Sequence, residues 1–202
     1  MAANILVDST LSIYNSGQNG LPLTQAATNQ IGYFQANDTA FPIPSGIVMV
    51  AAQNASDVIA STNGAGNNVT FTDAELASVL TQLGSSGYAI KDMVEIEFSF
   101  IAQSDSISFN YCFGSHEYDG YTCSNFNDVF GFFLEGSYIN GTTAPTGQTI
   151  VRNIATIPGT TIPIAVNTIN SGSPSGSYPA SNCTSPNPNF LAHSPYSNAS
   201  NG

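Results

Sequence analysis

The fold is decided by a stretch that reads Phe109-Asn-Tyr-Cys-Phe-Gly-Ser-His-Glu-Tyr-Asp119 and then Asn125-Phe-Asn-Asp-Val-Phe-Gly-Phe-Phe-Leu134. Alternating aromatic residues in the first run indicate a strand, and the apolar residues from Val129 to Leu134 indicate a central strand covered on both faces. Side chains with oxygen acceptors gather between the two runs. The stretch therefore predicts a strand-loop-strand unit whose loop suits a hard cation or a sugar, whereas covalent catalysis would need a nucleophile beside a base.

Strand patterns dominate the rest of the chain as well. Short apolar or alternating runs, separated by Gly, Pro and Asn turns, predict strands near residues 47–50, 94–100, 107–113, 129–134 and 162–166. This pattern predicts a mostly β fold, an antiparallel β-sandwich of jelly-roll type.

One short capped α-helix is expected at about residues 72–84. Thr72 and Glu75 form a capping box, apolar residues follow at helical spacing up to Leu83, and Gly84 is suited to end the helix. We expect its apolar face to pack on the sandwich.

Composition divides the chain into a domain and a tail. Residues 1–170 are expected to form one β-sandwich domain, since a chain of 202 residues can bury one substantial core. Residues 171–202 are rich in Ser, Pro, Asn and Gly without apolar periodicity, so we expect a coil that is tied down only where Cys183 is bridged.

The charge balance excludes whole classes of partner. Charged residues make up 7% of the chain, only two residues are Lys or Arg, and the net charge is -11. Nucleic acid and anionic membrane surfaces would be repelled. No apolar stretch approaches the ~20 residues that span a bilayer, and the start has no signal-peptide pattern, so an exported form is expected to have lost its signal already.

The three cysteines allow at most one intramolecular disulfide. We predict a bridge between Cys123 and Cys183 and a buried thiol at Cys112, with three reduced cysteines as the alternative. No Cys-x-x-Cys spacing points to zinc.

A family resemblance rests on several motifs that occur in order between about Asn4 and Asn170. They are Gly46-Ile-Val-Met-Val50, the capped helix, Glu95-Ile-Glu-Phe98, Asp105-Ser-Ile-Ser-Phe109, Phe113-Gly-Ser-His-Glu-Tyr118, Asn127-Asp-Val-Phe-Gly-Phe-Phe133, Asn153-Ile-Ala155 and Ile157-Pro-Gly-Thr160. Together they resemble the choice-of-anchor L domain. The resemblance implies an exported bacterial surface module, frequent in Bacteroidetes, without an established catalytic activity and located extracellularly or at the cell surface.

Two departures from the family pattern matter. His116 stands where the family usually has a Glu, which removes one candidate carboxylate from the loop. The family also usually continues through further strands, so we expect an incomplete strand set here. A sheet that lacks a strand exposes N–H and C=O groups for pairing with another chain.

The loop between the two runs is the candidate metal site. Glu117, Asp119, Asn127 and Asp128 could supply hard oxygens to calcium, which accepts about six to eight of them. The alternative is that Asn127 and Asp128 cap a turn through bonds to the backbone while Glu117 is solvated.

Enzymatic activity is not expected. His116, Glu117 and Ser115 are neighbours that would point to opposite faces of a strand, and no Gly-x-Ser-x-Gly elbow is present. The paired carboxylates of a glycosidase are not expected either, because Glu95 and Glu97 fit the solvent side of a half-buried strand.

Two kinds of surface feature remain as candidates. Tyr118, Tyr121 and Tyr138 could form a platform for sugar stacking, with ordinary loop packing as the alternative. The glycosylation candidates are Thr39, in an Asp-Thr-Ala signal for O-linked sugar, and the sequon residues Asn37, Asn54, Asn68, Asn140, Asn182 and Asn198.

The sequence thus favours a non-catalytic extracellular or cell-surface module for adhesion or surface display, whose partners would be other surface-protein domains. The first alternative is a structural subunit that self-associates into an extracellular filament by strand complementation. The second is a calcium-dependent carbohydrate-binding module.

Overall fold

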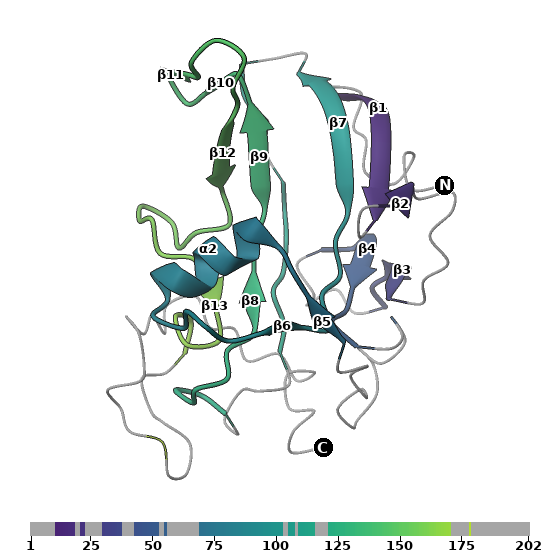
Figure 1. The fold of residues 1–202 in the computed structure, drawn as a ribbon. Coiled ribbons are helices and arrows are strands. Elements are labelled where there is room, and N and C mark those ends of the chain that lie inside the picture. The colour runs from purple at the N-terminus through teal and green to yellow at the C-terminus, as the bar shows by residue number, and fades with distance from the viewer. Residues whose placement is uncertain are drawn as a thin grey trace. The chain divides into compact units, whose positions relative to one another are not determined.

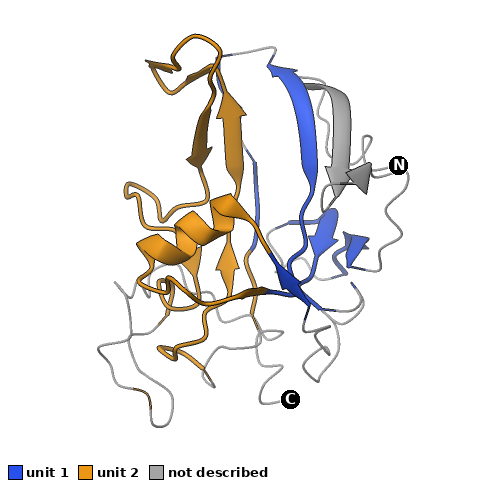
Figure 2. Ribbon diagram, viewed as in Figure 1, with its two compact units in different colours: residues 1–71, 91–112, 202 blue, residues 72–90, 113–201 orange. Residues whose placement is uncertain are grey.

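A computed structural model describes residues 11–18, 21–22, 30–37, 43–52, 55, 69–102, 105–107, 109–115, 121–170 and 178. The chain forms two compact units, shown in Figure 2: unit 1 comprises residues 1–71 and 91–112, and unit 2 comprises residues 72–90 and 113–201. Each unit is described by itself below, with the element labels of Figure 1.

The described strands of unit 1 form small sheets, and pairing is antiparallel between β1 and β2, β1 and β7, and β3 and β4. One sheet has the order β2-β1-β7, a second joins β3 to β4, and a third joins β5 to β6. The second segment of unit 1 begins within β6, at Lys91. Their bounds are β1 Leu11–Gln18, β2 Leu21–Pro22, β3 Ile31–Gln35, β4 Ser45–Met49, β5 Thr70–Phe71, β6 Ile90–Lys91 and β7 Glu97–Ala102.

Strand β7 carries the alternation expected for residues 94–100. Pairing with β1 starts at Glu97 and runs to Ala102, so the strand begins three residues later than the first apolar residue of the pattern. Phe98 and Phe100 lie with ring centroids 5.9 Å apart, as expected for residues i and i+2 on one strand face.

Unit 2 combines short antiparallel strand pairs with a helix. β8 pairs with β13, β9 with β12 and β10 with β11. The bounds are α2 Ala74–Gln82, β8 Val129–Phe130, β9 Phe133–Gly136, β10 Tyr138–Ile139, β11 Thr142–Thr143, β12 Ile150–Asn153 and β13 Ile164–Ala165.

Two apolar clusters form the core of unit 2. Val79 of α2 and Leu83, the C-cap of this helix, pack with Ala165, and the half-buried Val129 and Phe133 complete this cluster. The second cluster is built from Ala155, Ile157, Ile164 and Ile169, with Phe113, Phe130, Phe132 and Ile162 packed against it. Each buried Val, Leu or Ile side chain stabilises the unit by roughly 1.5–3 kcal/mol. The helix therefore packs its apolar face on this part of the sheet structure, as predicted.

The sequence prediction is right for one end of the helix and wrong for the other. Its N-cap is Asp73, whose Oδ1 accepts a hydrogen bond from the Leu76 N–H at 2.6 Å, so the predicted capping role of Thr72 is wrong by one residue. The end at Gly84 is confirmed, with φ +73. Bonds from Ser85 N to Leu80 O and from Gly84 N to Thr81 O form the Schellman pattern, which needs that left-handed glycine.

The expected strand over residues 129–134 is divided into β8 and β9. The Asn153 side chain takes the place of a backbone partner at the break, since its Oδ1 accepts from Phe132 N at 3.1 Å and from Ala155 N at 3.0 Å. A Cβ on Gly131 would lie 2.4 Å from a ring atom of Phe133. The break therefore requires glycine and an amide side chain from another strand.

One sequence prediction for this architecture needs correction, and another is confirmed only in its coarser part. The described residues among 107–113 form no strand, because alternation is also compatible with an extended segment that lacks the regular hydrogen-bond ladder of a sheet. The mostly β, antiparallel character is confirmed. The jelly-roll sandwich is not, since the described strands form small sheets of two or three strands.

Candidate functional site

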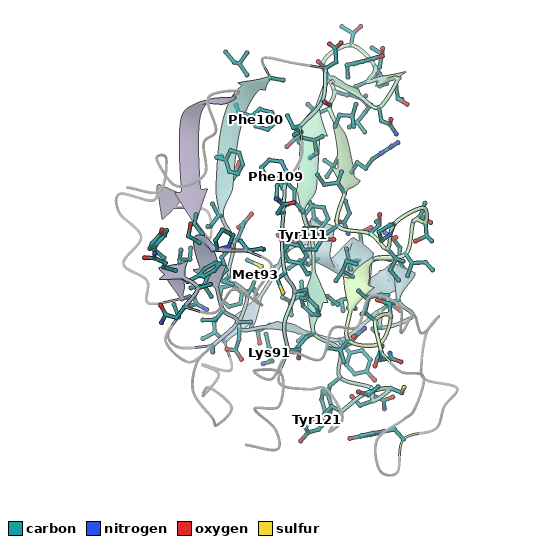
Figure 3. All side chains as sticks on the ribbon, turned by 180° about the vertical axis from the view of Figure 1, so that it is seen from behind. Lys91, Met93, Phe100, Phe109, Tyr111 and Tyr121 are labelled. Carbon is teal, nitrogen blue, oxygen red and sulfur yellow. The ribbon has the colours of Figure 1, made fainter. Side chains whose placement is uncertain are left out.

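The loop of residues 121–128, here called the aromatic loop, reverses the usual arrangement of polar and aromatic side chains. It precedes β8, and Figure 3 shows Tyr121 at the end of unit 2 opposite the β10–β11 hairpin of Figure 1. Thr122, Cys123 and Ser124 are buried, whereas Tyr121 is 44% exposed and Phe126 is 61% exposed. Burying small polar residues and exposing large aromatic ones needs a structural cause.

The cause is a set of hydrogen bonds from Asn167, 44 residues from Cys123 in the sequence. Its Oδ1 accepts from Cys123 N at 2.8 Å, and its Nδ2 donates to Ser124 O at 3.0 Å. The backbone N–H of Asn167 donates in turn to Asn127 Oδ1 at 3.1 Å. Since an unpaired buried polar group costs about 1–3 kcal/mol, these bonds allow the loop to turn its polar residues inward.

Local bonds hold the aromatic positions from within the loop. Ser124 Oγ accepts from Phe126 N at 3.0 Å and donates to Phe126 O at 2.9 Å, and Ser124 N donates to Tyr121 O at 2.9 Å. Cys123 has a left-handed φ of +64, a conformation that costs a non-glycine residue energy and persists where its surroundings hold it.

The two exposed aromatic side chains contact each other. The rings of Tyr121 and Phe126 lie 6.4 Å apart at 83°, the edge-to-face arrangement that aromatic pairs favour. Phe126 and Asp128 are exposed while Asn127 between them faces inward to Asn167. The loop therefore presents two rings and a carboxylate on its outer side.

The predicted calcium ligands are only partly within the described residues. Asn127 Oδ1 accepts from Asn167 N, and Asp128 Oδ2 accepts from Ser115 Oγ at 2.6 Å. Glu117 and Asp119 lie outside the described residues, as does His116. Within the described part of the chain there is no group of three or more His, Cys, Asp or Glu side chains that could hold a metal. Calcium binding therefore stays a prediction.

The cysteines differ in their chemical state. Cys123 is fully buried and bonded in a disulfide. Its predicted partner, Cys183, lies outside the described residues, so that pairing stays a prediction. Cys112 is a free cysteine and is exposed, so its predicted burial in a core strand is wrong; the protein around its sulfur still raises the pKa of the thiol by desolvation. Burial likewise raises the pKa of Tyr111.

Two of the predicted glycosylation residues are described, and both are exposed. Asn37 follows β3. Asn140 has φ +49 and is followed by Gly141 at φ +79 between β10 and β11, the Asn-Gly pattern of a tight hairpin turn, which accounts for this Asn without a sugar. The others, Thr39, Asn54, Asn68, Asn182 and Asn198, lie outside the described residues. Glycosylation stays a prediction.

The sequence offers Tyr121 as a candidate and does not indicate the two other residues that matter here, Phe126 and Asn167. Tyr138 is exposed on β10, away from Tyr121 in unit 2, and Tyr118 lies outside the described residues. Phe126 precedes the apolar run that starts at Val129, and its polar neighbours Asn125 and Asn127 are the only local signal of its exposure. No sequence pattern identifies Asn167, because its partners are distant in the chain.

Comparison with known families and proteins completes these observations. The family model described as the choice-of-anchor L domain matches residues 1–201, a span that includes the segment from residue 171. Comparison with curated proteins found no match, and comparison with solved structures found none either.

Proposed function

The chain belongs to the choice-of-anchor L domain family, and from that premise we propose that it is a non-catalytic extracellular module whose aromatic loop mediates adhesion. Family membership implies a surface-associated or extracellular module. The observation that carries the adhesive function is the exposed Tyr121–Phe126 pair on a loop held by buried hydrogen bonds.

A binding surface that is already ordered in the free protein loses little conformational entropy when a partner binds. Aromatic anchors with few rotatable bonds lose little conformational entropy on binding, and rigid anchors supply much of the energy of protein interfaces. Tyr121 and Phe126 are already positioned by Ser124 and Asn167 in the free chain. A partner would therefore meet a surface that needs little rearrangement.

The charge of the chain bears on the class of partner. The net charge of -11, with two basic residues, disfavours nucleic acid as the partner. Among the described residues, no helix combines the length and apolar character required to cross a bilayer.

Adhesion can be tested with beads that carry the full chain under flow. We expect retention on at least one of a set of surfaces coated with matrix proteins, glycans or the chain itself. The double variant Tyr121→Ala/Phe126→Ala should lose most of this retention, while Tyr138→Ala, which removes an aromatic ring 66% exposed elsewhere in unit 2, should keep it. Equal retention of both variants, or none by the wild type, would contradict the proposal.

Strand β12 favours a second candidate, a filament subunit assembled by strand complementation. Within the described part of the chain, β12 pairs with β9 alone, and its Val151 is exposed. A strand with an open edge is a template for another chain. Ordered fibres in negative-stain electron microscopy would support this candidate, and loss of the fibres in EDTA would show that assembly depends on calcium. Discrete particles would contradict the filament candidate and favour the adhesive module.

A glycan is a further candidate occupant of the aromatic loop, because sugar rings can stack on exposed aromatic side chains such as those of Tyr121 and Phe126. Binding to a glycan array that is lost in the Tyr121→Ala/Phe126→Ala variant would support it.

A further inference from the structure

The outer side of the aromatic loop combines ring surface with negative charge. Phe126 and Asp128 are both exposed, and Tyr121 contacts Phe126 edge to face. The hydroxyl of Ser115 donates to Asp128 Oδ2 and so restrains the carboxylate. This side of the loop thus holds two kinds of group that attract a cation, a π-face and a carboxylate.

The charge of the whole chain acts in the same direction. The chain has two Lys or Arg residues and thirteen Asp or Glu residues, and its net charge is -11. Neither basic residue belongs to the loop: Lys91 is in β6, where its Nζ donates to Thr70 Oγ1 at 2.7 Å, and Arg152 is in β12. The summed field attracts positively charged partners and repels acidic ones.

From this combination we infer that the aromatic loop binds an arginine- or lysine-bearing segment of a partner protein, a conclusion that rests on the proposed adhesive function. Arginine fits best, because a guanidinium group can stack on an aromatic face while its fork of N–H groups bonds a carboxylate such as that of Asp128. Electrostatic complementarity would then set the rate of encounter and the choice of partner.

Other occupants fit the charge less well. An acidic protein or a nucleic-acid duplex would be repelled by the negative charge of the chain. A neutral glycan would gain no electrostatic attraction from that charge. A second copy would bring its own net charge of -11 to the contact and could offer only Lys91 and Arg152 as cations.

The test uses the full chain and two immobilised peptides, Gly-Arg-Gly-Arg-Gly and the same peptide with citrulline in place of arginine, both in EDTA. Citrulline keeps the shape of arginine and removes its charge. We expect preferential binding of the arginine peptide, about tenfold weaker in Tyr121→Ala/Phe126→Ala and unchanged in Tyr138→Ala. The double variant keeps the backbone bonds of Phe126 and the charge of the chain, so an unchanged melting temperature will show that it folds.

Charge is tested by a second pair of variants. Asp128→Asn should weaken arginine-peptide binding several-fold, whereas Glu97→Gln, which removes an exposed carboxylate from β7, should have little effect. Raising the salt from about 50 mM to about 500 mM should weaken binding of the arginine peptide more than that of the citrulline peptide.

Several results would overturn the inference. They are equal binding of the two peptides, equal losses in the aromatic variant and the Tyr138→Ala control, glycan binding in place of peptide binding, or concentration-dependent self-association that Arg152→Gln abolishes. Loss of bead adhesion in the aromatic variant without arginine preference would leave the proposed function standing and remove this inference. Arginine preference without any adhesion would remove the proposed function and leave standing only the preference of the loop for arginine.

Discussion

Asn167 shows how one side chain can determine the conformation of a distant loop. Its amide oxygen accepts from Cys123 N and its amide nitrogen donates to Ser124 O, so both halves of the amide are used. Because Asn167 is itself buried, neither loop group has an easy route to solvent. The exposure of Tyr121 and Phe126 is the consequence of this inward anchoring.

We therefore expect Asn167→Ala to reduce the free energy of unfolding by about 2–4 kcal/mol, since it leaves two buried backbone groups without partners. Urea denaturation measures this change. Asn110→Ala, at an exposed residue of unit 1, is the matched control and should have little effect. Equal stability of the two variants would show that water or another group replaces the Asn167 bonds.

At the scale of elements, helix α2 and the divided strand show how local chemistry and packing combine. The helix is defined by its caps at Asp73 and Gly84, both of them local, and by Val79 and Leu83, which pack on residues far along the chain. The interruption between β8 and β9 has a tertiary cause, because Asn153 of β12 supplies the acceptor for Phe132 N.

Asp73→Ala should destabilise the protein by about 1 kcal/mol, because Leu76 N loses its acceptor at the start of α2. Thr72→Ala should change stability by a few tenths of that amount, since Thr72 stands outside the cap. Thermal melts of the two variants at equal protein concentration provide the measurement. A larger loss of stability for Thr72→Ala than for Asp73→Ala would show that Thr72 caps the helix, as the sequence suggests.

At the scale of the whole molecule, charge is the dominant property. Thirteen acidic residues with two basic ones leave a chain with few internal ion pairs and a net charge of -11. Self-repulsion destabilises such a chain, and cations that bind to the folded state relieve it. The predicted calcium site follows the same logic.

Calcium at about a hundredfold excess over its Kd should add about 2.7 kcal/mol to stability if it binds the folded state alone, and EDTA should remove the gain. Differential scanning calorimetry with magnesium as the control ion measures this effect. Asp128→Asn should abolish most of the calcium shift, and Glu97→Gln should retain it. A melting temperature that is the same in calcium and in EDTA would exclude calcium binding to the native state.

Sequence alone determined the mostly β character, the capped helix near residues 72–84, the end of that helix at Gly84 and the family, because alternation, caps and ordered motifs are local properties of a chain. Tertiary structure alone decided that the strand over 129–134 divides, that the described part of 107–113 forms no regular strand, and that Phe126 is exposed. These outcomes depend on Asn153 and Asn167, whose amide groups bond to backbone brought near them only by the fold.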